Sequence, residues 1–343
     1  MSKRILELEK NTWIQAYQIR NFELGVLQKK TPWILSKHIN CYYDSKAMGI
    51  FNHCMPEKRY FTKYKALIVQ KFRFDTSFLS LDILNFATWA KNLIDGGWYI
   101  MGYYDEYYIP ETVSYQQRHF RHTMLIYGYD DESQLFYAMG YTSDRKYRSH
   151  CLTYDEFISS IGVDFDRENE SYIKRDIERI EFDAFRLNPK CDFTFDLCQV
   201  YTSLLDYINC EDSGCRHQRG LKYGFDCERE FVNYIKSQKG KYLDERYSRL
   251  FMELKELMVR RLEYLTGEQV VSKEILPEYK IICEQQKTIH LLFIKYNLTM
   301  DERIIDRLVD KMSGIIDAEK NILPRITDEI YACLVRRHNE EYL

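Results

Sequence analysis

Several features that mark common protein classes are missing from this 343-residue chain. Neither a GxxxxGK[ST] nor a GxGxxG motif occurs, and the 14 glycines leave little material for loops that cradle phosphates, which argues against nucleotide-driven chemistry. No apolar run reaches the roughly 18 residues that a membrane helix requires. The first residues also lack the continuous apolar core of a signal peptide. We therefore expect a cytoplasmic protein with no membrane partner.

The chain also lacks an excess of charge of either sign. Its 49 basic and 52 acidic residues give a net charge of -3 without long single-sign runs, so there is no electrostatic footprint for a nucleic acid partner. Hydrophobic residues at 45% and charged residues at 29% are typical of folded globular proteins. The length favours two domains with substantial cores.

The ten cysteines have no paired spacing, and without a signal peptide we interpret them as reduced thiols. Cys210, Cys215, His217 and Cys227 form a loose cluster that could be drawn as a zinc site. No CxxC knuckle is present, however, and the spacing fits no common zinc module. We therefore expect structural cysteines and no intrinsic metal or cofactor.

The spacing of apolar residues changes near residue 190. Before it, aromatic-rich alternating runs at 98–109, 123–129 and 135–142 predict strands, and the polar residues 130–133 predict a hairpin spanning 122–142. After Pro189, apolar residues recur at helical spacing over 250–265 and 304–316. Thr299 and Glu302 resemble a capping box that starts the last helix, and Pro324 interrupts its pattern. We predict an α+β fold: an antiparallel-sheet domain at 1–189 and a helical bundle at 190–343.

Cys41 is the candidate nucleophile. Asn40 before it, and the spacing of Tyr43, Ala47 and Phe51 after it, predict a short helix that opens at the cysteine with Asn40 as N-cap. The amides and dipole at a helix N-terminus favour a thiolate. The alternative is a buried cysteine that only fills space in the core.

His122 is the candidate general base. It opens the strand 123–129, so it lies at an edge that readily faces a cleft. An imidazole can take the proton of a thiol and serve the second substrate in turn. His119 is the alternative, because periodicity does not choose between the two.

Three segments, GWYIMGYYDEYYIPE at 97–111, YQQRHFRHTMLIYGYDD at 115–131 and QLFYAMGY at 134–141, resemble the papain-fold transferases related to the butirosin-pathway acyl carrier transferase. INCYYDSKAMGIF at 39–51 resembles the nucleophile segment of that family, and MELKELMVRRLEYL at 252–265 resembles its C-terminal helix. The resemblance implies a papain-like, cysteine-peptidase-like N-terminal domain and a helical C-terminal domain. It makes Cys41 the nucleophile and His122 the general base.

The resemblance leaves the third catalytic residue open. Gly140 stands where the family usually has an Asp that orients the imidazole. Asp144 is the first candidate to replace it, and Asp105 is the second. A dyad oriented by Thr142 or a backbone carbonyl is the remaining option.

Members of that family act in nonribosomal peptide and thiotemplated pathways, including antibiotic biosynthesis. The resemblance therefore implies ATP-independent amide formation: transfer of an acyl or peptidyl group from the phosphopantetheine thioester of a carrier protein to a small-molecule amine. It also suggests polythioamide assembly of the closthioamide type. Arg260 and Arg261 are weakly indicated as carrier contacts. The alternatives are a cysteine peptidase or hydrolase, and a catalytically inactive scaffold of a biosynthetic complex.

Overall fold

The computed structural model describes residues 2–46, 49–54, 69–75, 84–161, 181–191, 193–213 and 220–340. The chain divides into two units. Unit 1 comprises Met1–Lys29 and Phe61–Cys191, and unit 2 comprises Lys30–Tyr60 and Asp192–Leu343. The change of sequence pattern near residue 190 coincides with one of the points at which the chain passes from one unit to the other. The sequence pattern did not indicate that the segment beginning at Lys30 belongs to the helical unit.

Unit 1 is built on an antiparallel sheet of seven described strands in the order β4-β9-β5-β6-β7-β8, with β1 also pairing with β6. The strands are β1 (Lys3–Ile5), β4 (Val69–Asp75), β5 (Tyr99–Asp105), β6 (Arg121–Asp130), β7 (Leu135–Tyr141), β8 (Tyr147–Thr153) and β9 (Glu181–Leu187).

The predicted hairpin is confirmed as β6 and β7, which pair from Leu125–Met139 to Asp130–Leu135. Asp130 closes its turn, because one carboxylate oxygen accepts the amides of Glu132 and Ser133 at 3.1 and 3.3 Å.

Three of the helices in the described part of unit 1 pack against this sheet. They are α1 (Gln18–Leu27), α2 (Leu84–Asp95) and α3 (Tyr154–Ile161). Aromatic rings join α2 and α3 to the strands: Phe86 lies 5.6 Å from Phe157 and 5.2 Å from Phe182, and Phe157 lies 5.8 Å from Tyr104. These buried rings hold the strand β5 in place up to the point where the candidate site begins.

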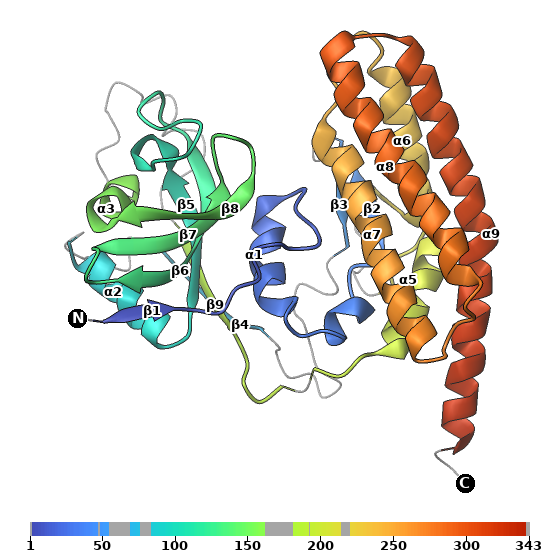
Figure 1. Ribbon diagram of the computed structural model, residues 1–343, viewed down its shortest axis with the longest axis horizontal. Coiled ribbons are helices and arrows are strands. Elements are labelled where there is room, and N and C mark those ends of the chain that lie inside the picture. Colours follow the sequence, from blue (N-terminus) through green and yellow to red (C-terminus); the bar gives the residue numbers. More distant parts are fainter. Residues whose placement is uncertain are drawn as a thin grey trace. The chain divides into compact units, whose positions relative to one another are not determined.

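Unit 2 combines a small sheet with a helical bundle. Its strands β2 (Cys41–Asp44), β3 (Ile50–His53) and β10 (Leu221–Tyr223) are antiparallel in the order β10-β2-β3. A 3-10 helix, η1 (Trp33–Ser36), precedes them. The bundle consists of α5 (Leu197–Asn209), α6 (Gly224–Ser237), α7 (Glu245–Gly267), α8 (Ile275–Thr299) and α9 (Arg303–Glu340). Figure 1 shows α7, α8 and α9 running side by side.

The start of α9 differs from the prediction. Thr299 is the last residue of α8, and its hydroxyl donates back to the Lys295 carbonyl at 2.9 Å. The side chain of Asp301 accepts the Arg303 amide at 3.1 Å and so caps α9. The predicted capping box of Thr299 and Glu302 is therefore wrong, because α8 extends farther than its pattern indicated.

Pro324 does not end α9, which continues to Glu340. A proline inside a helix costs about 3 kcal/mol because it removes one hydrogen bond and crowds the preceding turn. Leu323, Ile326 and Ile330 are buried on either side of it, and burial of such side chains contributes about 1.5–3 kcal/mol each. Packing of α9 therefore outweighs the proline.

The predicted α+β class is confirmed: antiparallel sheets occur in both units and helices dominate unit 2. Among the described residues, no helix is both long enough and apolar enough to cross a membrane.

Candidate active site

His122 is held by a carboxylate that the sequence analysis did not consider. It is the second residue of β6 and pairs with Tyr104 of β5. The short helix η2 (Glu106–Tyr108) follows β5 directly, and the Glu106 amide donates to the Phe120 carbonyl at 2.9 Å. This places Glu106 Oε1 2.7 Å from His122 Nδ1.

The geometry of this pair suits proton transfer. Glu106 is buried, whereas 36% of the His122 side chain is exposed. A carboxylate on Nδ1 fixes the orientation of the ring and directs Nε2 away from itself. Within the described part of the chain, no residue bonds to Nε2. One ring nitrogen is thus anchored and the other is left to exchange a proton.

His119 forms a second pair of the same type. Its Nδ1 lies 2.7 Å from Asp105 Oδ2, and its ring stacks on Tyr107 with centroids 4.4 Å apart. The other Asp105 oxygen accepts the amides of Tyr107 and Phe120 at 3.1 and 3.0 Å. Asp105, a candidate partner for His122, therefore contacts His119 and braces the connection between β5 and β6.

Asp144, the first candidate for the third catalytic residue, is engaged in the turn between β7 and β8. Its Oδ1 accepts the Thr142 hydroxyl at 2.6 Å, and its Oδ2 lies 3.5 Å from both Lys146 and Arg148. The Thr142 hydrogen bond lowers the pKa of this carboxyl. On the imidazole of His122 the structure places Glu106, and not Asp144 or Thr142.

Cys41 opens strand β2, and not a helix. The spacing that suggested a helix face belongs to a hairpin: Tyr43 pairs with Phe51 on β3, and their rings lie 4.8 Å apart. Two consecutive tyrosines favour such a pleated surface. The predicted helix is therefore wrong, and with it the helix dipole as a source of thiolate.

The backbone around Cys41 is closed by Asn40. Asn40 Oδ1 accepts the amides of Cys41 at 2.9 Å and of Gly224 at 3.1 Å. The Cys41 thiol is fully buried and lies 4.0 Å from the Gly224 carbonyl. Because its amide is already bonded to Asn40, Cys41 does not offer a free backbone donor for an oxyanion.

The nearest imidazole by register is that of His53. Cys41 and His53 are paired on β2 and β3, and Cys54 donates its amide to the Asn40 carbonyl at 2.8 Å. The Cys41–His53 pair is therefore a non-hydrogen-bonded one, in which facing side chains come closest. Burial and contact with Cys41 raise the pKa of the adjacent Cys227 thiol well above its ordinary range. Thus Cys41 lies among buried thiols.

The two halves of the predicted catalytic pair belong to different units. His122 lies in unit 1 and Cys41 in unit 2.

The bundle of unit 2 contains a buried charged cluster with one residue from each helix. Lys255 Nζ lies 3.1 Å from the Tyr207 hydroxyl, 2.7 Å from Glu228 Oε1 and 2.6 Å from Glu319 Oε2. The Tyr279 hydroxyl donates to Glu319 Oε1 at 2.5 Å. Burial raises the pKa of Glu228 to about 7. Sequence periodicity did not predict this cluster, because its members occupy helix positions at which apolar core residues are expected.

Arg261 borders the same interior. It is buried, and its guanidinium donates to the carbonyls of Leu35 and Lys37 at 2.6 and 2.7 Å. Burial lowers its pKa to about 10. Arg261 is therefore wrong as a contact for a carrier protein, whereas Arg260 is exposed.

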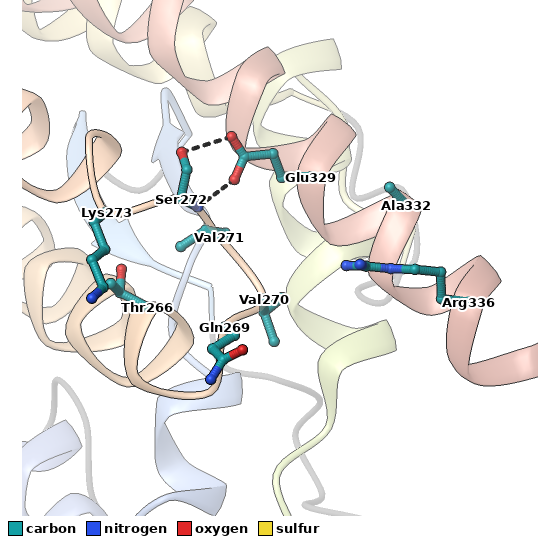
Figure 2. A pocket seen from close by; sticks show the side chains of 9 residues that line it. All are labelled: Thr266, Gln269, Val270, Val271, Ser272, Lys273, Glu329, Ala332 and Arg336. Atoms are coloured by element: carbon teal, nitrogen blue, oxygen red, sulfur yellow. Dashed lines mark hydrogen bonds between the residues drawn. The ribbon is translucent and has the colours of Figure 1, made fainter. Parts of the chain in front are cut away.

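A groove of about 730 Å³ lies in unit 2 between the α7–α8 connection and α9. Glu329 takes part in its wall by accepting the backbone amide and hydroxyl of Ser272 (Figure 2). Arg336 extends from α9 toward Val270 in the same view. The groove is lined by neither histidine nor cysteine, so its walls hold none of the predicted catalytic groups.

No arrangement of three or more His, Cys, Asp or Glu side chains suited to a metal ion occurs in the described ranges. Of the cluster considered for zinc, Cys215 and His217 lie outside the described residues. Cys210 and Cys227 are free thiols. The 29 tyrosines contribute many of the ring contacts in both units.

The chain matches no protein-family model and no curated protein.

Proposed function

We propose that this protein is a cysteine-dependent acyltransferase that forms an amide from a thioester, with Cys41 as nucleophile and His122 as general base. The observation that supports it is the 2.7 Å contact between His122 Nδ1 and Glu106 Oε1. General-base catalysis needs a ring that is oriented and has one accessible nitrogen, and this contact provides both. Glu106 takes the place of the carboxylate for which Asp144 and Asp105 were candidates.

The reaction has two steps. In the first, Cys41 Sγ bonds to the carbonyl carbon of an acyl thioester on a carrier-protein phosphopantetheine. The carbon–sulfur bond to the carrier breaks, and the thiol proton leaves on the carrier sulfur. In the second, an amine nitrogen bonds to the same carbon and the bond to Sγ breaks. His122 takes a proton from the amine and returns it to the Cys41 thiolate.

This mechanism makes two demands on the protein. The Cys41 thiol, fully buried in strand β2, must become accessible to the thioester, and it must meet the imidazole of His122. Its burial among other thiols favours a second candidate function, a catalytically inactive scaffold of a biosynthetic complex.

Intact-mass analysis after incubation with a synthetic N-acetylcysteamine acyl thioester distinguishes the two. We expect an acyl adduct on the wild type and none on Cys41→Ala. The matched control is Cys227→Ala, which removes a neighbouring buried thiol and should retain the adduct. Added amine should then release the acyl group as an amide.

The other outcomes are equally informative. Loss of the adduct without amine would identify a hydrolase. An adduct that persists in Cys41→Ala would assign the chemistry to another residue. The absence of an adduct under every condition would overturn the acyltransferase and leave the scaffold.

A further inference from the structure

The outer face of α8 carries large apolar side chains in water. Ile281, Leu291 and Leu298 are 62%, 64% and 81% exposed. The opposite face is apolar as well, since Ile289 and Phe293 are fully buried. A surface helix normally has one apolar face and one polar face, and a helix that is apolar all round is usually covered on every side. The packing of α8 against α7 and α9 thus leaves three large apolar side chains exposed along its outer face.

Six of the exposed positions on this face have a symmetric order. From the N-terminal end they are Ile281, Glu284, Thr288, Leu291, Lys295 and Leu298. If a second α8 lies antiparallel on this face, Ile281 faces Leu298, Glu284 faces Lys295, and Thr288 faces Leu291. All three pairings share one centre, between residues 289 and 290. A single register therefore places Ile281 against Leu298 and also Glu284 against Lys295.

The charges on this face favour such a partner. Lys295 has no ion pair with any described residue, and Glu284 is paired at 2.8 Å only with Lys287 of its own helix. In the antiparallel register each Glu284 meets the Lys295 of the other copy, so two unlike-charge contacts form. A parallel arrangement would instead place each residue against its own copy, with like charges opposed.

We propose that the α8 face, defined by these six positions, is the interface of a homodimer of this chain. The two copies are related by a twofold axis through the centre of the stripe, which makes the contact self-complementary. The stripe is about 25 Å long at 1.5 Å per residue. Dimers that bury one helix face are at the small end of specific interfaces, so we expect dissociation in the micromolar range.

Ion pairs border the stripe on both sides. Lys280 pairs with Glu263 of α7 at 2.8 Å, and Arg325 of α9 pairs with Glu278 at 2.6 Å. Apolar contacts surrounded by a polar rim are the usual anatomy of a protein interface. The dimer does not depend on the proposed acyl transfer.

Sedimentation velocity of the full-length protein over a concentration series tests the interface. We expect a reversible monomer–dimer equilibrium for the wild type and a monomer for Leu291→Glu, because two carboxylates would be buried near the axis. The matched control is Val335→Glu, which places the same charge at another exposed apolar position, on α9, and should leave the dimer intact.

Charge reversal tests the register. Glu284→Lys and Lys295→Glu should each weaken the dimer by about tenfold or more, because each opposes like charges. The double variant restores both contacts and should recover the wild-type affinity. A wild type that stays monomeric, a dimer that survives Leu291→Glu, or a double variant that does not recover would each overturn the proposal.

Discussion

Glu106 Oε1 lies 2.7 Å from His122 Nδ1, although the two residues are 16 positions apart. The contact arises because β5 and β6 are antiparallel neighbours and η2 turns back over the start of β6. Glu106 follows Asp105 directly, yet the two carboxylates contact different histidines. The candidate base is therefore oriented by η2, which follows β5, and not by the hairpin of β6 and β7.

Replacing Glu106 by Gln removes the carboxylate that contacts His122 Nδ1 while nearly keeping the side-chain shape. We expect release of the acyl group to an amine to slow by about a hundredfold, because loss of such a carboxylate reduces general-base catalysis by several orders of magnitude at most. Single-turnover release from a pre-acylated enzyme measures it.

Asp105→Asn is the control for that experiment. It alters the matching pair on His119 but keeps an oxygen for the amides of Tyr107 and Phe120. Asp144→Asn changes the carboxylate engaged by Thr142. Both should release the acyl group at the wild-type rate, and an equal loss in all three variants would contradict a specific role for Glu106.

Two glycines should respond in opposite directions to alanine. Gly224 begins α6 at φ +49°, and an added Cβ would lie 1.9 Å from the Tyr207 carbonyl. Gly314 lies inside α9, and an added Cβ meets nothing within 4 Å. Gly224→Ala should therefore lower the free energy of unfolding by about 3 kcal/mol or more. Gly314→Ala should raise it by about 0.5–1 kcal/mol.

Urea denaturation followed by circular dichroism checks both substitutions. The Gly224 amide and carbonyl contact Asn40 and Cys41, so the same substitution should also disturb the environment of the thiol. A stable Gly224→Ala variant would mean that this turn relaxes easily.

The sequence predicts the elements whose contacts are local, and it does not predict those that depend on long-range pairing. The hairpin of β6 and β7 was predicted because its strands and its turn are consecutive and Asp130 closes the turn locally. The long helices were predicted from apolar spacing. Cys41 was misplaced because Tyr43 and Phe51, eight residues apart, satisfy both a helix face and a hairpin pair, and only long-range pairing with β10 decides between them.

The candidate site was less predictable than the fold. His122 lies at the start of an apolar strand, as its sequence context predicted, but Glu106 comes from η2, which follows the neighbouring strand β5. Reasoning from the single sequence considered only the hairpin on the other side. Two adjacent acids at the end of a strand were the available signal for Glu106. Lys255 and Glu319, 64 residues apart, meet only in the assembled bundle.

Lys255 should be essential to the stability of unit 2. Lys255→Met leaves the carboxylates of Glu228 and Glu319 buried without a cation, and breaking a buried pair in this way costs about 3–5 kcal/mol. The control Lys280→Met breaks the exposed pair with Glu263, half-exposed on both sides, and should cost less than about 1 kcal/mol. Urea midpoints of the two variants measure the difference.

A second substitution isolates the cause. Adding Glu228→Gln and Glu319→Gln to Lys255→Met removes the orphaned charges, so part of the lost stability should return. If the triple variant is less stable than Lys255→Met, packing and not charge accounts for the loss.

Glu228 should make stability depend on pH near neutrality. Its pKa is about 7 in the folded protein, against an ordinary value of 4.5. Between these values the folded state holds a proton that the unfolded state has released, so raising the pH lowers the free energy of unfolding. The loss should develop from about pH 5 and level off above about pH 8. Glu228→Gln keeps the shape but does not titrate, so its urea midpoint should fall less over this range.

Glu278→Gln is the matched control, because the hydrogen bond from Arg325 shifts the pKa of Glu278 downward, in the opposite direction. That variant should retain the wild-type decline in stability between about pH 5 and pH 8. The cluster around Glu228 also contains Glu319 and Lys255, so the decline belongs to the group as a whole. If Glu228→Gln and the wild type lose stability equally with rising pH, Glu228 does not carry the pH dependence.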